Sequence, residues 1–107
     1  MDRLEQINQS LAQLMKDLPE DLKSFSNFIQ VAEAEGSLES KTKHLILLAL
    51  GMEAQCEWCI ALHTKDAVAA GASKQEILEA AMMSVVMGGG PKLMHFEVLY
   101  EELKKYF

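Results

Sequence analysis

Apolar side chains recur every three or four residues along almost the whole chain, and this spacing restricts the fold to helices. The N-terminal stripe shows the pattern, with apolar residues at Leu4, Ile7, Leu11, Leu14 and Leu18. Strict alternation of apolar and polar residues is absent, and so are hairpin turns of the Asn-Gly type. The sequence therefore predicts an all-α protein.

Glycine and proline residues divide the chain into about six predicted helices. Pro19 and Pro91 suit a first helical turn, whereas Gly36 suits a helix end. Ser73 and Glu76 have the spacing of a capping box, in which each side chain accepts the other residue's backbone N–H. The expected helices cover residues 4–18, 19–35, 40–50, 56–70, 74–87 and 91–103. We expect residues 1–107 to form one domain, a compact bundle of these helices.

The run from Leu45 to Leu50 has no polar face, so the sequence predicts a segment that is buried on every side at the centre of the core. The preceding helix has a predicted inner face of Leu22, Phe25, Phe28, Ile29 and Ala32. Glu33, Glu35 and Glu39 are interpreted as a solvated face. Half of the 107 residues are hydrophobic, too many for so small an interior, so we expect an oligomer.

Charge excludes several classes of function. The net charge is −6 and the chain has one arginine, Arg3, and no basic cluster, so neither nucleic acid nor an anionic membrane is an expected partner. The apolar run from Leu45 to Met52 is too short to span a bilayer, and residues 1–18 lack the apolar segment of a signal peptide. We therefore expect a cytoplasmic protein, in which two close cysteines indicate redox chemistry or metal binding.

The segment with the clearest chemistry is Cys56-Glu57-Trp58-Cys59-Ile60-Ala61-Leu62-His63. On a helix, Cys56, Cys59 and His63 share one face, one turn apart from each other. The helix N-terminus favours a thiolate, and His63 can accept the proton of Cys59. Cys59 is then the candidate nucleophile. Cys56 would attack the resulting sulfenic acid or mixed disulfide and close a disulfide bond.

Two other interpretations of these residues stay open. The cysteines can be small core residues with a satisfied core histidine. Alternatively, Cys56, Cys59 and His63 can bind structural zinc with His44 as a fourth ligand, although three ligands on one helix make a poor tetrahedral site. The corresponding functional alternative is a non-enzymatic oligomeric module whose thiols bind zinc or sense redox state.

Residues 38–91 resemble the alkylhydroperoxidase-D-like branch of the carboxymuconolactone decarboxylase superfamily. The resemblance rests on the order and spacing of five elements. These are the segment Leu38–Ala49, the run Cys56-x-x-Cys59-x-x-x-His63-Thr64, Ala70–Ser73, Glu76-Ile77 and Met87–Pro91.

The resemblance implies an all-helical fold assembled as trimers or hexamers, and thiol-dependent reduction of small hydroperoxides or disulfides. In that family the second cysteine attacks the peroxide and the first then forms the disulfide with it. Cys59 matches the attacking cysteine and Cys56 the resolving one. His63 matches the histidine of a proton relay. Electrons would come from a dithiol donor such as a thioredoxin-like or lipoyl-bearing protein. We expect no cofactor and no metal in the protein.

One position departs from the family pattern. The relay glutamate usually precedes the Leu-Ile pair of the preceding helix, and here that position is His44. A histidine also moves protons near neutral pH, so His44 is a candidate relay residue. Alternatively, Glu53 supplies the carboxylate, or His44 is an ordinary helix-surface residue. The decarboxylase branch lacks the cysteine pair, so lactone decarboxylation is not expected.

Overall fold

The computed structural model describes all 107 residues and contains helices without strands, which confirms the all-α prediction. The seven helices are α1 (Arg3–Asp17), α2 (Pro19–Glu33), α3 (Ser40–Glu53), α4 (Glu57–Ala69), α5 (Lys74–Gly88), α6 (Gly90–Met94) and α7 (Phe96–Leu103). None of them combines the length and the apolar character that a membrane span requires.

Local sequence signals account for the helix starts. Asp2 and Glu5 form a capping box at α1, and Ser73 and Glu76 form the predicted one at α5. Pro19 occupies the first turn of α2, where a missing N–H has no cost. These signals define where α1, α2 and α5 begin before any tertiary contact is made.

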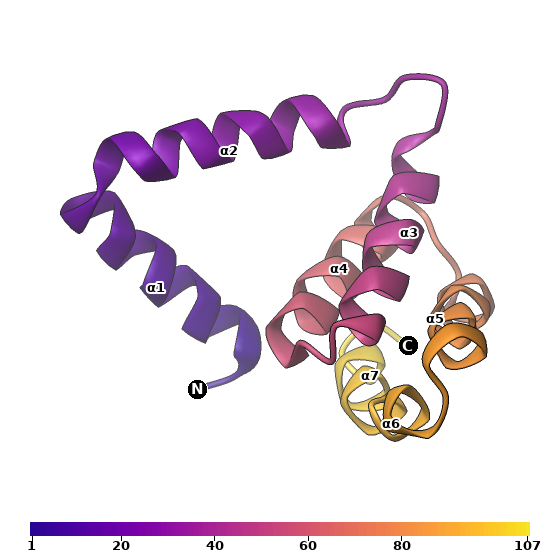
Figure 1. The fold of residues 1–107 in the computed structure, drawn as a ribbon. Coiled ribbons are helices and arrows are strands. Elements are labelled where there is room, and N and C mark those ends of the chain that lie inside the picture. The colour runs from indigo at the N-terminus through magenta and orange to yellow at the C-terminus, as the bar shows by residue number, and fades with distance from the viewer.

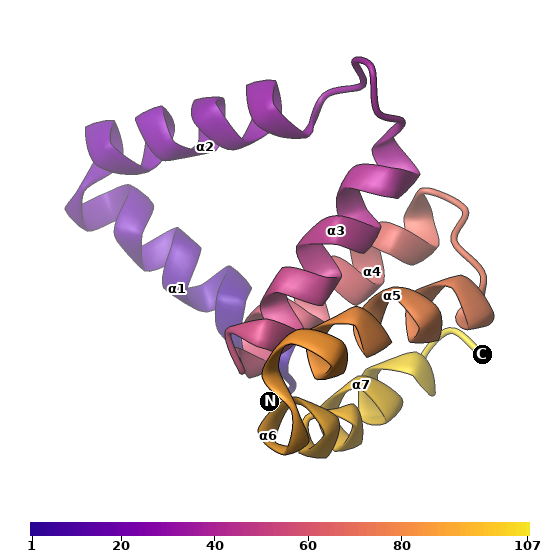
Figure 2. The same ribbon diagram turned by 45° about the vertical axis from the view of Figure 1, so that its right-hand side comes forward.

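The helices form a core group and a bent arm. Figures 1 and 2 show α3 to α7 gathered together, while α1 and α2 extend away from them and return at the start of α3. Neither α1 nor α2 contains a buried residue. The arm is therefore attached to the core group mainly at its two ends.

The hydrophobic core lies between α3, α4, α5 and α7. Its large, fully buried apolar side chains are Leu48, Met52, Ile60, Ile77, Leu99 and Leu103. Truncating such a side chain to alanine typically costs about 2–5 kcal/mol, because a cavity remains where the atoms were. These contacts hold α3 and α4 against each other, and the cysteine pair lies at the start of α4.

Polar bonds attach the start of the arm to the core group. Arg3 in the first turn of α1 donates to Glu102 of α7 at 3.1 Å and to Glu57 of α4 at 3.0 Å. The Trp58 indole N–H donates to Gln6 of α1 at 2.7 Å. The side chain of Glu102 is only 2% exposed, so its ion pairs are shielded from water.

Two sequence predictions differ from the structure. The predicted helix 91–103 is two helices, because the His95 N–H bonds to Lys92 three residues back and tightens the chain between α6 and α7. The run from Leu45 to Leu50 is not buried on every side. Leu48 is fully buried, but Ile46 is 45% exposed and Leu50 is 57% exposed.

The exposure of α3 has a structural cause. The arm does not close over the helix, so the outer face of α3 stays uncovered in a single chain (Figure 1). The predicted inner face of α2 is likewise open, with Phe25 58% and Phe28 63% exposed. Apolar periodicity predicted where most of the helices lie but not what covers them.

Candidate redox site and the adjoining histidine cluster

Cys56 and Cys59 are joined by a disulfide at the start of α4. Their Cα atoms are 5.2 Å apart, and both residues are half-buried. Cys56 is the N-cap residue rather than the first helical residue, and Gln55 before it has a positive φ of 55°. The Gln55 side chain accepts a hydrogen bond from Lys92 at 2.7 Å, which holds this bend in place.

The backbone at this helix start is directed at the first sulfur. The Cys59 N–H donates to Cys56 Sγ at 3.1 Å, in the position that an N-cap oxygen usually takes. The helix dipole and this N–H favour negative charge at the pair. After reduction of the disulfide, backbone donation would stabilise a thiolate on Cys56, whereas the feature that favours Cys59 is His63 one turn after it in the sequence.

His63 is half-buried on α4. Its Nδ1 atom is buried and has no hydrogen-bond partner in the protein. Burial lowers the pKa of His63 below its ordinary value, despite the opposing effect of the Asp66 and Glu33 carboxylates. A neutral imidazole at neutral pH is a proton acceptor, which is the state that activation of a thiol requires.

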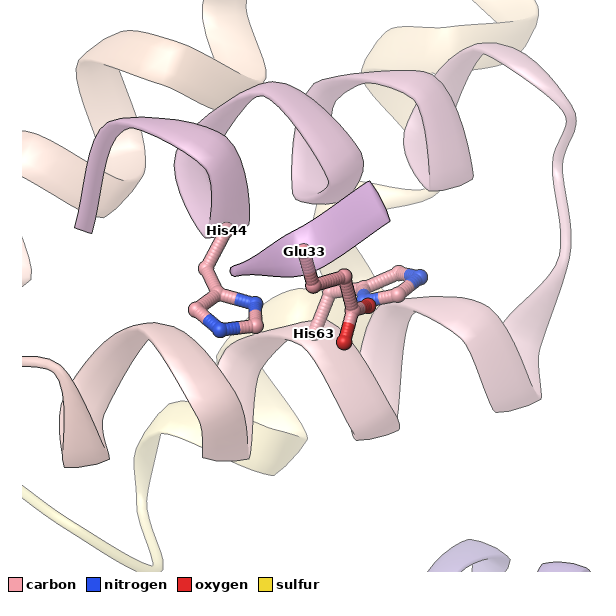
Figure 3. Close-up of side chains that lie close together, drawn as sticks. All are labelled: Glu33, His44 and His63. Atoms are coloured by element: carbon pink, nitrogen blue, oxygen red, sulfur yellow. The ribbon is translucent and has the colours of Figure 1, made fainter. Parts of the chain in front are cut away.

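His63 belongs to a cluster of three side chains from three helices. Figure 3 shows Glu33 of α2 and His44 of α3 directed toward His63 of α4. One donor atom from each residue lies within 4.8 Å of the other two. All three residues are half-buried, and the Nδ1 atom of His44 also lacks a partner. The structure therefore brings the two predicted histidines together and adds a carboxylate.

Glu33 was missed as a site residue in the sequence. Its interpretation as part of a solvated face is wrong, although Glu35 and Glu39 of the same group are exposed. Lys43 explains its position, because the Lys43 ammonium donates to the carbonyls of Ala32 at 2.9 Å and Ala34 at 2.6 Å. A cation at a helix C-terminus satisfies its free carbonyls, so the end of α2 is fixed beside α3. No local sequence signal identifies this contact.

Glu53 is not the carboxylate of the histidine cluster. Its Oε1 atom lies 3.9 Å from the ammonium of Lys92, and it also lies close to Gly88. The ion pair directs it toward the junction of α5 and α6. Glu53 is therefore directed away from the histidine cluster, in which Glu33 is the acidic residue.

Two surface hollows meet at Glu33. The first is mostly apolar, with a volume of about 390 Å³, and includes Phe28, Ile29 and Ile46 beside Glu33. The second is polar and includes His44 and Asp66. Glu33 and His44 are thus accessible from the surface.

Comparison with known proteins identifies the chain. A sequence profile of the carboxymuconolactone decarboxylase family matches residues 19–99. The chain belongs to this family. A family protein from Legionella pneumophila has a solved structure that is 38% identical, with a TM-score of 0.90 covering 95% of this chain and 91% of its own.

Other family relatives are more distant. A Thermotoga maritima family protein, described with a possible part in the antioxidative response, has a structure with a TM-score of 0.85 and 27% identity, covering 97% of this chain and 89% of its own. An uncharacterised Cupriavidus necator protein is 31% identical over 93 residues, covering 87% of this chain and 82% of its own. These likenesses confirm the resemblance at the level of the family and its fold.

Proposed function

We propose that this carboxymuconolactone decarboxylase family protein is a thiol-dependent oxidoreductase of the alkylhydroperoxidase-D-like branch. The observation that carries the proposal is the disulfide between Cys56 and Cys59 at a helix N-terminus, with His63 one turn further along. The antioxidative role suggested for the Thermotoga maritima relative agrees with it. The substrate is a small hydroperoxide or a disulfide.

The peroxide reaction needs two steps in the protein. In the reduced pair, His63 accepts the thiol proton of Cys59, and the thiolate attacks the outer oxygen of the hydroperoxide. An S–O bond forms, the O–O bond breaks, and the alkoxide takes the proton from His63 and leaves as an alcohol. Cys59 is then a sulfenic acid.

The second step closes the disulfide. The thiol of Cys56 loses its proton and its sulfur attacks the sulfenic sulfur of Cys59, so that an S–S bond forms and hydroxide leaves as water with that proton. The N–H bond to Cys56 Sγ at 3.1 Å supports this step because it stabilises the attacking thiolate. A dithiol donor, thioredoxin-like or lipoyl-bearing, then supplies two electrons and two protons. That donor suits a compartment that keeps thiols reduced, so we place the reaction in the cytoplasm.

Glu33 and His44 have supporting roles in this scheme. When His63 holds a proton, the Glu33 carboxylate beside it stabilises the imidazolium ion. His44 offers a second imidazole through which the proton can pass to the surface. Glu33 thus does the work that the family assigns to a glutamate at the position of His44.

We also propose that the protein works as a homotrimer or homohexamer. A monomer leaves large apolar side chains on every helix of the arm and on α5, including Phe28, Val31, Val86 and Met87. Exposed apolar area of this extent is typical of subunit interfaces. Light scattering on the purified protein should give a mass of three or six chains, whereas a monomer would contradict this assembly.

The test of the proposed function is a pair of cysteine variants. Cys59→Ser should abolish hydroperoxide and disulfide turnover. Cys56→Ser should complete one attack and stop at a sulfenic acid or mixed disulfide, which dimedone labelling and mass spectrometry locate on Cys59. Full activity of both variants contradicts the proposal. If the wild type is oxidised once and does not turn over with any candidate donor, that result would favour the redox sensor instead.

A further inference from the structure

The histidine cluster has the composition of a metal site that does not involve the thiols. Glu33, His44 and His63 come from α2, α3 and α4, and one donor atom of each lies within 4.8 Å of the others. Donors from separate helices can surround an ion, which three ligands along one helix do not do. The arrangement in Figure 3 differs from the zinc set considered from the sequence, because the disulfide removes both cysteines.

Two unsatisfied nitrogens support a ligand at this place. The Nδ1 atoms of His44 and His63 are both buried and lack hydrogen-bond partners in the protein. Buried polar atoms in proteins are nearly always paired. The third histidine of the chain, His95, shows the usual arrangement, since its Nδ1 lies 2.8 Å from the Pro91 carbonyl oxygen. Two unpaired imidazoles in one cluster therefore indicate a missing partner that accepts lone pairs.

The donor types select the class of ion. Two imidazoles and one carboxylate suit a divalent transition metal and disfavour calcium or magnesium, which prefer oxygen ligands. Three protein ligands leave a coordination position for water, and the polar hollow that includes Glu33, His44 and Asp66 gives access to it.

We propose that Glu33, His44 and His63 bind one divalent transition metal ion such as Zn²⁺. Binding requires the donors to move closer together, because atoms around a tetrahedral zinc ion are about 3.3 Å apart. The Glu33 side chain can supply this movement by changing its rotamer, since it is only half-buried. The bound ion would then tie the arm to the core group.

Metal binding has a consequence for the thiol chemistry. This consequence rests on the proposed redox function, whereas the metal site itself does not. A neutral imidazole has one basic lone pair, and an ion bound to His63 would occupy it, so His63 could no longer accept the proton of Cys59. The metal-bound protein would then be the less reactive thiol state.

The experiment is a Co²⁺ titration of the full-length, fully oxidised protein. With the disulfide intact the cysteines cannot act as ligands, and visible absorption reports Co²⁺ bound to nitrogen and oxygen. We expect one Co²⁺ per chain, displaced by Zn²⁺. Glu33→Gln and His44→Ala should each weaken binding at least tenfold, since even indirect changes around a metal cost that much.

Matched variants test the specificity of the site. Glu35→Gln removes the same charge two residues away, and His95→Asn removes the histidine outside the cluster, so both should bind Co²⁺ like the wild type. Glu33 lies on the arm, and circular dichroism should show that Glu33→Gln keeps its helices. Absence of Co²⁺ binding, or equal binding by Glu33→Gln and the wild type, would overturn the metal site. Neither result bears on thiol turnover, which the cysteine variants test separately.

Discussion

Gly51 of α3 lies directly against Cys59 of α4. A Cβ atom placed on Gly51 would be 3.2 Å from Cys59 Cβ and 3.4 Å from the Cys59 carbonyl carbon. Gly51 is buried and Cys59 is half-buried, so an added methyl group would have to displace backbone or Cβ atoms of α4. The absence of a side chain at Gly51 therefore lets α3 approach the redox pair.

Gly51→Ala should destabilise the oxidised protein by about 1 kcal/mol. Overpacking against α4 costs about 1–3 kcal/mol, and the gain in helix propensity from glycine to alanine returns about 1 kcal/mol of that. Urea unfolding measures the difference. Gly36→Ala is the matched control, because nothing lies within 4 Å of its added Cβ. A Gly51→Ala protein that is as stable as the wild type would show that α3 and α4 separate easily.

Arg3→Ala should release the start of the arm. Arg3 is the guanidinium partner of the buried Glu102, and losing a partner of a buried charge typically costs about 3–5 kcal/mol. Lys105 remains 2.9 Å from Glu102, so we expect a loss of about 2 kcal/mol, together with faster proteolysis of α1. Lys23→Ala breaks an exposed pair and should change stability by less than about 0.5 kcal/mol. Equal effects of the two variants would contradict this assignment.

Lys43→Met should loosen the end of α2 and displace Glu33. The ammonium of Lys43 donates to the carbonyls of Ala32 and Ala34, and a cation at a helix C-terminus typically contributes about 0.3–1 kcal/mol. Hydrogen exchange should accelerate at the amides of the last turn of α2, while α5 is unchanged. Lys74→Met, which removes a lysine for which the structure shows no ion pair, is the control. Unchanged exchange in the last turn of α2 would show that other contacts hold this helix.

Protonation of Glu76 should make the protein less stable in acid. Its pKa is lowered by the backbone N–H of Ser73 first and by Lys41 second. A carboxylate with a depressed folded pKa contributes stability above its unfolded pKa, near 4.5, and this contribution disappears as pH falls through the folded value. In Glu76→Gln, the free energy of unfolding should fall less steeply as pH drops below about 5, which urea unfolding measures. Glu79→Gln is the control, because it removes a charge from the same helix but not from the capping box. Its free energy of unfolding should depend on pH as in the wild type.

His63→Asn should lower kcat/KM for hydroperoxide by about 10²–10⁴, the usual contribution of a general base. Glu33→Gln should give a smaller loss, because Glu33 supports the imidazolium without touching the substrate. His95→Asn removes a histidine outside the cluster and should react like the wild type. Stopped-flow measurement of sulfenic acid formation on Cys59 separates the first step from reduction by the donor. An undiminished rate in His63→Asn would remove this residue from the mechanism.

Much of the fold followed from local patterns. The spacing of apolar residues predicted the helices, and Ser73 with Glu76 predicted the start of α5. The break at His95 was not predicted, because it depends on a backbone hydrogen bond from the His95 N–H to the Lys92 carbonyl, and no side chain in the sequence marks that bond. Burial of the run from Leu45 to Leu50 was also mispredicted. Periodicity shows that a helix is apolar, but only the placement of other helices decides which side is covered.

The sequence by itself determined that Cys56 and Cys59 meet at the start of α4, because residues three apart at a helix start are neighbours in any fold that keeps the helix, and it placed His63 four residues further along that helix. Only the tertiary structure decided that Glu33 joins His44 and His63. That meeting depends on the direction in which the chain turns between α2 and α3, and on the Lys43 bonds that hold the end of α2 there. Such contacts arise from the packing of whole helices, which no spacing within a single helix encodes.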